Sequence, residues 1–248
     1  MHIVVVVPTY DEAENLPKMV SALFGLPLDL EVLIVDDNSP DGTGRIADDL
    51  ANANPARMSV IHRAGKFGLA SAYQQAFRTL FDKNVDAIAH MDCDFSHDPE
   101  VLVEMAKRIE SCDVVFGSRY IPGGSTDVNW PLWRKGLSAW GNFYARTILG
   151  LPIRDVTGGF RMWKREALQS MPLDRVKSSG YIFTVEMAYL ADCLGFKICE
   201  TPIYFADRRW GKSKMSFKIQ IEAAFRVWNV LWNYRDLRRM RDEGRSKK

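Results

Sequence analysis

Two aspartates separated by one residue follow an apolar run near the middle of the chain. The apolar run from Val85 to Met91 is followed by Asp92 and Asp94, and Pro99 lies five residues after Asp94. Proline suits the first turn of a helix, so the aspartates are expected in a turn between a strand and a helix. Aspartate is seldom buried unless a cation or another partner compensates its charge. Two carboxylates in one turn can bind Mg²⁺ or Mn²⁺, with water and phosphate as further ligands. The same spacing also occurs in exposed turns that bind nothing.

Alternating strands and helices position this turn. Apolar runs predict strands at residues 2–7, 31–36, 58–62, 87–91 and 113–117, and helical spacing predicts helices at residues 16–24, 43–53, 68–81 and 99–110. Such alternation predicts an α/β fold with a parallel sheet covered on both faces. Ligands of these sheets bind outside the carboxyl ends of the strands. The loops at residues 8–15, 36–43, 63–68, 92–97 and 118–124 should therefore line one cleft. Paired acids at two of these strand ends favour a charged ligand over polar loops alone.

The composition is that of an ordinary globular protein. The 248 residues fit one large α/β domain or two small ones. A net charge of +2 gives no reason to expect nucleic-acid binding. The first apolar run, residues 3–7, is too short for a signal peptide, and no segment has the length of a transmembrane helix. We therefore expect neither secretion nor a membrane span.

Several common site types are missing from the sequence. The four cysteines, Cys93, Cys112, Cys193 and Cys199, lack the Cys-x-x-Cys spacing of a zinc site, and reduced thiols in a cytosolic protein are expected. Neither a Gly-x-Gly-x-x-Gly fingerprint nor a P-loop occurs, which argues against dinucleotide-binding and P-loop folds. A bound pyrophosphate would therefore need a metal and cationic side chains to balance its charge.

Six short motifs occur in order along the chain. They begin at Pro8, Asp36, Met91, Gly117, Asp155 and Phe205 and read PTYDEAEN, DDNSPDGT, MDCD, GSRY, DVTGGFR and FADR, the last running on to GKSK at 211–214. Over about residues 2–216 the set resembles inverting glycosyltransferase family 2, and within it the dolichyl-phosphate (polyprenyl-phosphate) β-D-mannosyltransferases. The resemblance implies the GT-A fold, the Rossmann-like α/β fold of nucleotide-diphospho-sugar transferases. That fold has a mixed, mostly parallel sheet with helices on both faces.

The resemblance assigns the donor site to loops after the strands. The positions that would hold the base and ribose of a GDP-sugar are Pro8, Tyr10, Glu12, Val35 and Asp37. Asp92 and Asp94 would bind the metal against the diphosphate, with the Cys93 backbone close by and Ser96 completing the metal shell. A ring and carboxylates suit a nucleoside. For Tyr10 and Val35, core packing is the alternative.

Four cationic positions also match the family and would meet the phosphates of both substrates. They are Arg119, Arg134, Arg208 and Lys214. Guanidinium groups bind phosphate through charge-assisted hydrogen bonds. Arg208 and Lys214 lie in a loop with Gly and Ser that is expected to close as a lid. A solvated helix face is the alternative for Arg134. Asp155 and Arg161 would shape the acceptor loop or form a structural salt bridge.

The implied reaction transfers mannose from GDP-mannose to a polyprenyl or dolichyl phosphate. A lipid phosphate is ionised at neutral pH and can attack without a general base, and the sequence shows no Ser/His/Asp or Cys/His arrangement. Asp94 would hold Mg²⁺ or Mn²⁺, and the bound metal would stabilise negative charge on the leaving diphosphate. Single displacement gives inversion. The alternatives are a polyprenyl-phosphate glucosyltransferase that uses UDP-glucose and a non-catalytic, membrane-associated module that binds sugar nucleotides.

The C-terminal segment favours a lipid substrate. Residues 1–215 would form the glycosyltransferase domain, and residues 216–248 an amphipathic helix to about 239 with a basic tail. Its wide apolar face carries Phe217, Ile221, Phe225, Trp228, Leu231, Trp232 and Tyr234. Such a helix can lie in a membrane interface with its basic residues against anionic lipid. Docking on the catalytic domain or on a second subunit is the alternative.

Residues 128–151 are a second candidate for the membrane interface. They carry Trp130, Trp133, Trp140 and Phe143. We therefore expect a peripheral protein at the cytoplasmic face of a membrane. The resemblance also allows for a membrane-anchoring partner subunit.

Overall fold

The computed structural model describes residues 1–207 and 217–246, with side chains described for residues 1–207 and 224–243. The main sheet contains β1 (Ile3–Thr9), β2 (Leu30–Asp36), β3 (Met58–His62), β4 (Ala87–His90), β5 (Val114–Ser118), β7 (Arg161–Lys164) and β8 (Ile198–Pro202). Its strand order is β3-β2-β1-β4-β7-β5-β8. A small second sheet pairs β6 (Ser125–Thr126) with β9 (Tyr204–Phe205).

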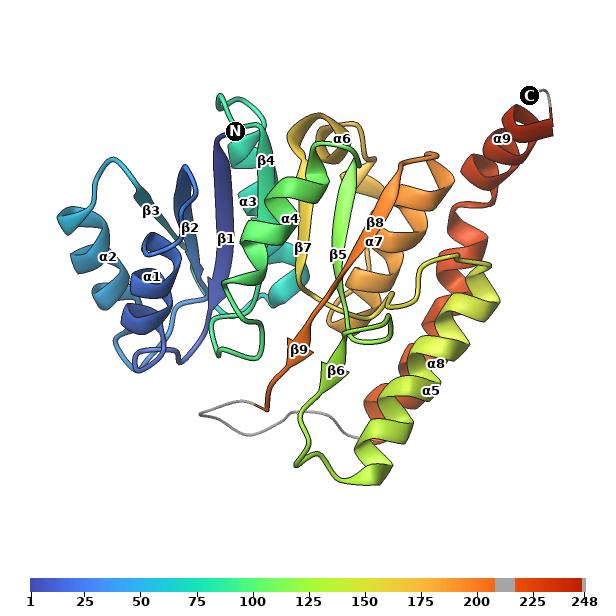
Figure 1. Ribbon diagram of the computed structural model, residues 1–248, viewed down its shortest axis with the longest axis horizontal. Coiled ribbons are helices and arrows are strands. Elements are labelled where there is room, and N and C mark those ends of the chain that lie inside the picture. The colour runs from blue at the N-terminus through green and yellow to red at the C-terminus, as the bar shows by residue number, and fades with distance from the viewer. Residues whose placement is uncertain (208–216, 247–248) are drawn as a thin grey trace.

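The main sheet is parallel except at β7. This strand runs antiparallel to both of its neighbours, β4 and β5. The predicted mixed, mostly parallel sheet is therefore confirmed. In Figure 1 the carboxyl ends of the parallel strands meet at the lower edge of the sheet, beyond which β6 and β9 lie. Because β7 enters the sheet from this edge, the loop that precedes it joins the loops that follow the other strands.

Helices cover both faces of the sheet (Figure 1). They are α1 (Leu16–Phe24), α2 (Thr43–Ala53), α3 (Leu69–Leu80), α4 (Val101–Ile109), α5 (Leu132–Leu149), α6 (Arg165–Gln169), α7 (Tyr181–Cys193), α8 (Phe217–Asn233) and α9 (Arg235–Ser246), with a 3-10 turn at Leu173–Arg175. On β1, Val5 faces the core under α1, α2 and α4, whereas Val4 and Val6 face the core under α3 and α7. This alternation is the period of a strand buried on both faces.

A disulfide corrects one expectation. Cys112, just before β5, is bonded to Cys199 on the neighbouring strand β8, so these two thiols are not reduced as predicted. Parallel pairing places their Cα atoms 6.1 Å apart, within the range that a disulfide spans. Their separation of 87 residues in the sequence conceals this proximity. Cys93 and Cys193 are free and buried.

The C-terminal segment forms two helices where one was expected. Helix α8 ends at Asn233 and α9 begins at Arg235, with the fully buried Tyr234 between them. Helix α8 packs against α5 and α7 and buries Val227 and Val230, so the docked alternative holds for this face of the helix. Among the described residues, no helix is both long and apolar enough to cross a bilayer. The domain boundary expected at 215/216 lies outside the described residues.

Candidate active site

The acidic turn predicted from the sequence lies between β4 and α4. Phe95 adopts the left-handed conformation, with φ of +59°, which tightens the turn. The backbone N–H of Ser96 donates to Oδ1 of Asp94 at 3.0 Å. The N–H of Asp92 donates to Nδ1 of His97 at 3.3 Å. These contacts fix the backbone that carries both carboxylates, with Asp94 buried and Asp92 half-buried.

The oxygen atoms of this turn fit a hard divalent cation. The Ser96 Oγ is buried without a hydrogen-bond partner, although buried hydroxyls normally have one. Together with Asp92 and Asp94 it offers the oxygen ligands that Mg²⁺ and Mn²⁺ accept. Within the described residues no group of three or more His, Cys, Asp or Glu could hold a metal, so hydroxyl, water or phosphate ligands would be needed as well. Burial and the nearby carboxylates raise the pKa of Cys93, which keeps its thiol protonated.

An aromatic row joins the acidic turn to a cationic residue. The His97 ring stacks on Phe160 with centroids 5.1 Å apart and meets the edge of Phe205 at 5.3 Å. The guanidinium carbon of Arg119 lies 5.4 Å from the centroid of the same Phe205 ring. The Phe205 ring thus lies close to both the acidic turn and Arg119. Burial lowers the pKa of His97, so its neutral ring can accept the hydrogen bond from the turn.

Arg119 is fixed by a buried carboxylate. Asp155 accepts hydrogen bonds from the Arg119 backbone N–H at 3.0 Å, from Nε at 2.7 Å and from Nη2 at 2.9 Å. Nη2 also donates to Thr157 Oγ1 at 2.7 Å, whereas Nη1 makes a long 3.5 Å contact to Ser138 Oγ. Burial opposes both charges, but the pairing outweighs it, raising the pKa of Arg119 and lowering the pKa of Asp155. Nη1 is therefore the nitrogen of this ionised pair with the most capacity left for a phosphate.

Arg161 binds the backbone of the loop before β7 and does not form the salt bridge to Asp155 that was the alternative for it. It is buried, and donates from Nη2 to the carbonyl of Val156 at 2.9 Å and from Nε to that of Gly158 at 3.2 Å. Its guanidinium carbon lies 4.0 Å from the centroid of the Phe116 ring. Burial lowers its pKa to about 9. The salt bridge of Asp155 is thus made to another arginine, because the side chain of Arg161 turns into the core and binds carbonyls there.

Arg134 is anchored rather than solvated. It forms a 3.0 Å salt bridge to Asp207 and stacks over Trp130 at 3.7 Å from the ring centroid. The Trp130 ring also meets Phe205 edge-on at 5.6 Å, which places Arg134 at the end of the same aromatic row. Trp130 was predicted to face the membrane, but it is buried, so that prediction is wrong for this residue. Arg208 and Lys214 lie outside the described residues.

Two acids at the first loops are bound by the protein itself. Asp36 accepts from Thr9 Oγ1 at 3.0 Å and from Ser39 Oγ at 2.6 Å, which joins the ends of β1 and β2. Asp41 accepts from the Ala13 N–H at 3.1 Å and joins the two loops further out. These two carboxylates, one at the end of β2 and one in the loop after it, therefore have a structural role in holding neighbouring loops together.

The loop at residues 63–68 contacts two of the positions expected to bind the nucleoside, Asp37 and Tyr10. Asp37 accepts hydrogen bonds from Arg63 Nη1 and from the Gly68 N–H, the latter at 2.9 Å. The Lys66 ammonium lies 3.2 Å above the Tyr10 ring. The loop at residues 63–68 thus closes over the loops after β1 and β2.

Solvent access separates the remaining members of this group. Pro8, Tyr10 and Glu12 are half-buried, which leaves part of each side chain open to a ligand. The side chain of Val35 is fully buried in the core, as the packing alternative required.

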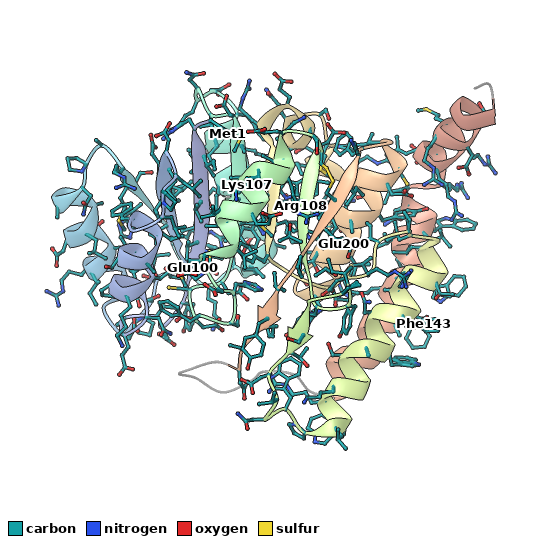
Figure 2. All side chains as sticks on the ribbon, in the orientation of Figure 1. Met1, Glu100, Lys107, Arg108, Phe143 and Glu200 are labelled. Carbon is teal, nitrogen blue, oxygen red and sulfur yellow. A yellow bond between two sulfur atoms is a disulfide. The ribbon has the colours of Figure 1, made fainter. Side chains whose placement is uncertain are left out.

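Beside the site, α5 and α8 form an aromatic surface, defined here as Trp133, Trp140, Phe143, Phe225, Trp228 and Trp232, each at least half exposed. The helices lie side by side in Figure 1, and the Phe143 side chain points away from the protein in Figure 2. Trp140 stacks on Tyr144 at 5.3 Å, and Trp228 Nε1 donates to the Tyr144 hydroxyl at 2.9 Å. The two rows of aromatics are therefore continuous. Exposed aromatic area of this extent marks an interaction surface.

Sequence reasoning missed several residues that shape the site. Arg63 had no signal beyond being a charged loop residue. His97 occupies the acidic turn, but nothing in its spacing indicates that its ring accepts a hydrogen bond from Asp92. Asn142 and Glu200 contact the loop before β7 from α5 and β8. These contacts join segments far apart in the sequence, which local patterns do not reveal.

The chain is similar to characterised glycosyltransferases. The family model described as glycosyl transferase family 2 matches residues 4–171. A polyprenol monophosphomannose synthase of Mycolicibacterium smegmatis is 42% identical over 91% of this chain and 86% of its own. An undecaprenyl-phosphate mannosyltransferase of Micrococcus luteus is 40% identical over 96% of this chain and 98% of its own.

Solved structures share the fold at lower identity. Glucosyl-3-phosphoglycerate synthase of Mycobacterium tuberculosis, with Mn²⁺, UDP and its product, superposes with a TM-score of 0.62 at 18% identity, over 94% of this chain and 79% of that one. S. aureus TarS with UDP-GlcNAc gives 0.62 at 17% identity, over 94% of this chain and 67% of that one. Both share the GT-A fold with this chain.

Proposed function

The chain belongs to glycosyltransferase family 2, and from this premise we propose that it transfers mannose from GDP-mannose to a polyprenyl phosphate. The observation that carries the proposal is that His97 of the acidic turn and Arg119 both lie against the ring of Phe205, at one edge of the sheet. Transfer of a sugar from a diphosphate to a phosphate needs carboxylates that bind a metal and cationic side chains that bind phosphate, close together at one site. The names of the two relatives at 40% and 42% identity support mannose and a polyprenyl acceptor.

The donor would bind across the loops after β1, β2 and β4. Asp92, Asp94 and Ser96 would hold Mg²⁺ or Mn²⁺, which, when bound, neutralises charge on the leaving diphosphate. The half-buried Tyr10 and Glu12 would face the nucleoside. Asp37, fixed by Arg63, would contribute a carboxylate oxygen with a set direction. Cys93 would contribute its backbone, because its thiol is protonated and enclosed.

The acceptor phosphate would lie toward Arg119 and Arg134. Its oxygen is ionised at neutral pH, so the protein orients the nucleophile and does not remove a proton from it. Arg119 keeps its charge because of Asp155, and its Nη1 would donate to the acceptor phosphate. Attack on the face opposite the diphosphate gives a β-mannosyl phosphate from an α-linked donor. Arg208 and Lys214 are proposed to complete the phosphate contacts.

The aromatic surface is proposed to lie in a membrane interface at the cytoplasmic face. Tryptophan rings are favourable at headgroup depth, and a polyprenyl chain reaches an enzyme only at its membrane. Helix α5 begins at Leu132, just after Trp130, and carries Arg134 as well as three members of the aromatic surface, so the surface and the proposed acceptor site share one element. The protein would be peripheral, held there by α5 and α8.

The test uses purified protein, a polyprenyl phosphate, and either GDP-mannose or UDP-glucose, with and without Mn²⁺. Production of lipid-linked mannose from GDP-mannose, with β configuration by NMR, is the expected result. Turnover of UDP-glucose alone would replace the mannose proposal by the glucosyltransferase. Donor binding without turnover of either donor would indicate a binding module.

A further inference from the structure

The loop from Arg154 to Gly158 determines where Arg119 lies. Asp155 has no exposed surface, and its carboxylate accepts all three short contacts from Arg119 described above. The same carboxylate accepts the N–H of Gly158 at 3.1 Å. A displacement of the Asp155 backbone would therefore be passed directly to the guanidinium group.

Glu200 holds this backbone from the edge of the sheet. Its Oε2 accepts the N–H of Arg154 at 2.9 Å, and its Oε1 accepts the N–H of Asp155 at 3.0 Å. Glu200 lies on β8, opposite Phe116 of β5 in the parallel register. Arg108 of α4 donates to the Glu200 carbonyl at 3.2 Å, and Figure 2 shows the two residues close together. A carboxylate can accept two consecutive N–H groups at once, which no neutral side chain of this length does equally well.

Asn142 holds the other side of the same loop from α5. Its Oδ1 accepts the N–H of Val156 at 2.8 Å, and its Nδ2 donates to the carbonyl of Arg154. Asn142 is buried, so neither bond competes with water. The residue must supply both a donor and an acceptor, which an amide does and a carboxylate does not. Asp155 is thus fixed on both sides by side chains from separate elements.

We propose that Glu200 and Asn142 are positioning residues for Arg119 in the transfer reaction. They act through Asp155 and do not touch the substrates. The inference rests on the proposed function, because it assigns them a part in placing Arg119 against the acceptor phosphate. Loss of either side chain lets Asp155 move, and a small misplacement of a phosphate-binding group lowers turnover strongly.

The test is a double-mutant cycle. Glu200→Gln and Asn142→Asp are each made in the natural chain and in Arg119→Lys, with Glu166→Gln and Asn84→Asp as matched controls at exposed positions. In the natural chain each test variant should lower kcat/KM for the polyprenyl phosphate about tenfold to a hundredfold. The KM for GDP-mannose should stay unchanged, because the donor loops are not involved. In Arg119→Lys the same substitutions should cost less than about twofold, since coupled residues are not additive.

A second measurement needs no turnover. The Nε–H signal of Arg119 in a ¹⁵N NMR spectrum should move toward that of exposed arginines in Glu200→Gln and stay in place in Glu166→Gln. Equal losses in both backgrounds, or unfolding of both test variants by circular dichroism, would show a purely structural role and overturn the proposal. If the natural chain itself makes no lipid-linked mannose, the proposed function fails, whereas an additive cycle in an active enzyme refutes only the positioning role.

Discussion

The hydroxyl of Tyr234 donates to Oε1 of Glu186 at 2.8 Å, and both side chains are buried. Tyr234 lies at the break between α8 and α9, and Glu186 lies in the middle of α7. The second carboxylate oxygen of Glu186 accepts the N–H of Ser178 at 3.0 Å. This bond therefore fixes the C-terminal helices on the catalytic domain and sets which side of α8 is exposed.

Tyr234→Phe should lower the free energy of unfolding by about 1–3 kcal/mol, because it leaves a buried carboxylate oxygen without its donor. Urea unfolding followed by circular dichroism measures this difference. Tyr204→Phe is the control, because it also removes a hydrogen bond to a carboxylate, that of Asp127, but at an exposed position, and it should cost less stability than Tyr234→Phe. Equal stability of Tyr234→Phe and the natural chain would contradict the anchoring role.

Asp155→Asn should destabilise the protein by about 3–5 kcal/mol, because it leaves the buried Arg119 charge unpaired. Since the native pKa of Asp155 lies below 3.8, the unfolded chain gains this proton first as the pH falls. The contribution of Asp155 to stability is thus present above pH 3.8 and is lost on acidification through its native pKa.

Unfolding free energies measured from pH 6 to pH 3 should fall less steeply in Asp155→Asn than in the natural chain. Asp174→Asn is the control, because this carboxylate is 95% exposed and pairs only at the surface. Parallel pH curves for the natural chain and Asp155→Asn would contradict an ionised Asp155.

Reduction of the Cys112–Cys199 bond should lower stability by about 2–5 kcal/mol, because the unfolded chain regains the freedom of a long closed loop. Dithiothreitol should lower the melting temperature of the natural chain, whereas the melting temperature of Cys112→Ser should be the same with and without dithiothreitol. A melting temperature of the natural chain that does not change in dithiothreitol would show that the disulfide does not form and that both thiols are reduced.

Asp94→Asn should abolish measurable mannosyl transfer, because it removes charge from the proposed cation site. Ser96→Ala should retain transfer but need about tenfold more Mn²⁺, as expected for loss of one neutral ligand. Product analysis measures transfer, and electron paramagnetic resonance titration of Mn²⁺ measures the metal affinity of both variants without turnover. Asp98→Asn, an exposed carboxylate two residues beyond Ser96, is the control. Unchanged Mn²⁺ affinity in Asp94→Asn would remove this turn as the cation site.

Replacing Trp133 and Trp232 together by Ser should weaken partitioning onto phosphatidylglycerol-containing vesicles by at least about tenfold, because each ring loses apolar contact with the bilayer. Flotation of the protein with these vesicles measures the bound fraction. Val227→Ala is the control, because Val227 faces the protein. A natural chain that does not float with vesicles would contradict the membrane proposal.

Much of the fold was predictable because the strands of a doubly covered sheet carry continuous β-branched runs. All strands and helices expected up to residue 118 occur within two residues of their predicted ends. The short β7 was not recognised, since its residues Arg161–Lys164 include two charged side chains. The inward turn of Tyr234 was not predictable either, because an aromatic residue on an apolar helix face suits a membrane and a protein core equally.

The site was predictable where one loop carries the chemistry. Asp92, Asp94 and Ser96 are neighbours in sequence, so a single turn between a strand and a helix brings them together whatever the rest of the chain does. Arg119 could be named from its motif, but its partner could not, because Asp155 is brought to it by the antiparallel entry of β7. The roles of Asn142 and Glu200 depend on the packing of α5 and β8 around that loop, and packing of this kind leaves no pattern in the sequence.

The adjacency of β5 and β7 has a consequence for how such an enzyme can be altered. Because these neighbouring strands are antiparallel, the chain leaves the sheet at Ser118 and returns beside the same point at Arg161. Everything between them, including β6, α5 and half of the aromatic surface, is an excursion with closely spaced ends. Lengthening or exchanging such an excursion adds little loop-closure entropy and leaves the strand order intact. Grafting this excursion from a relative while β1 to β4 are retained would thus test whether it sets the acceptor preference, as the proposed acceptor site requires.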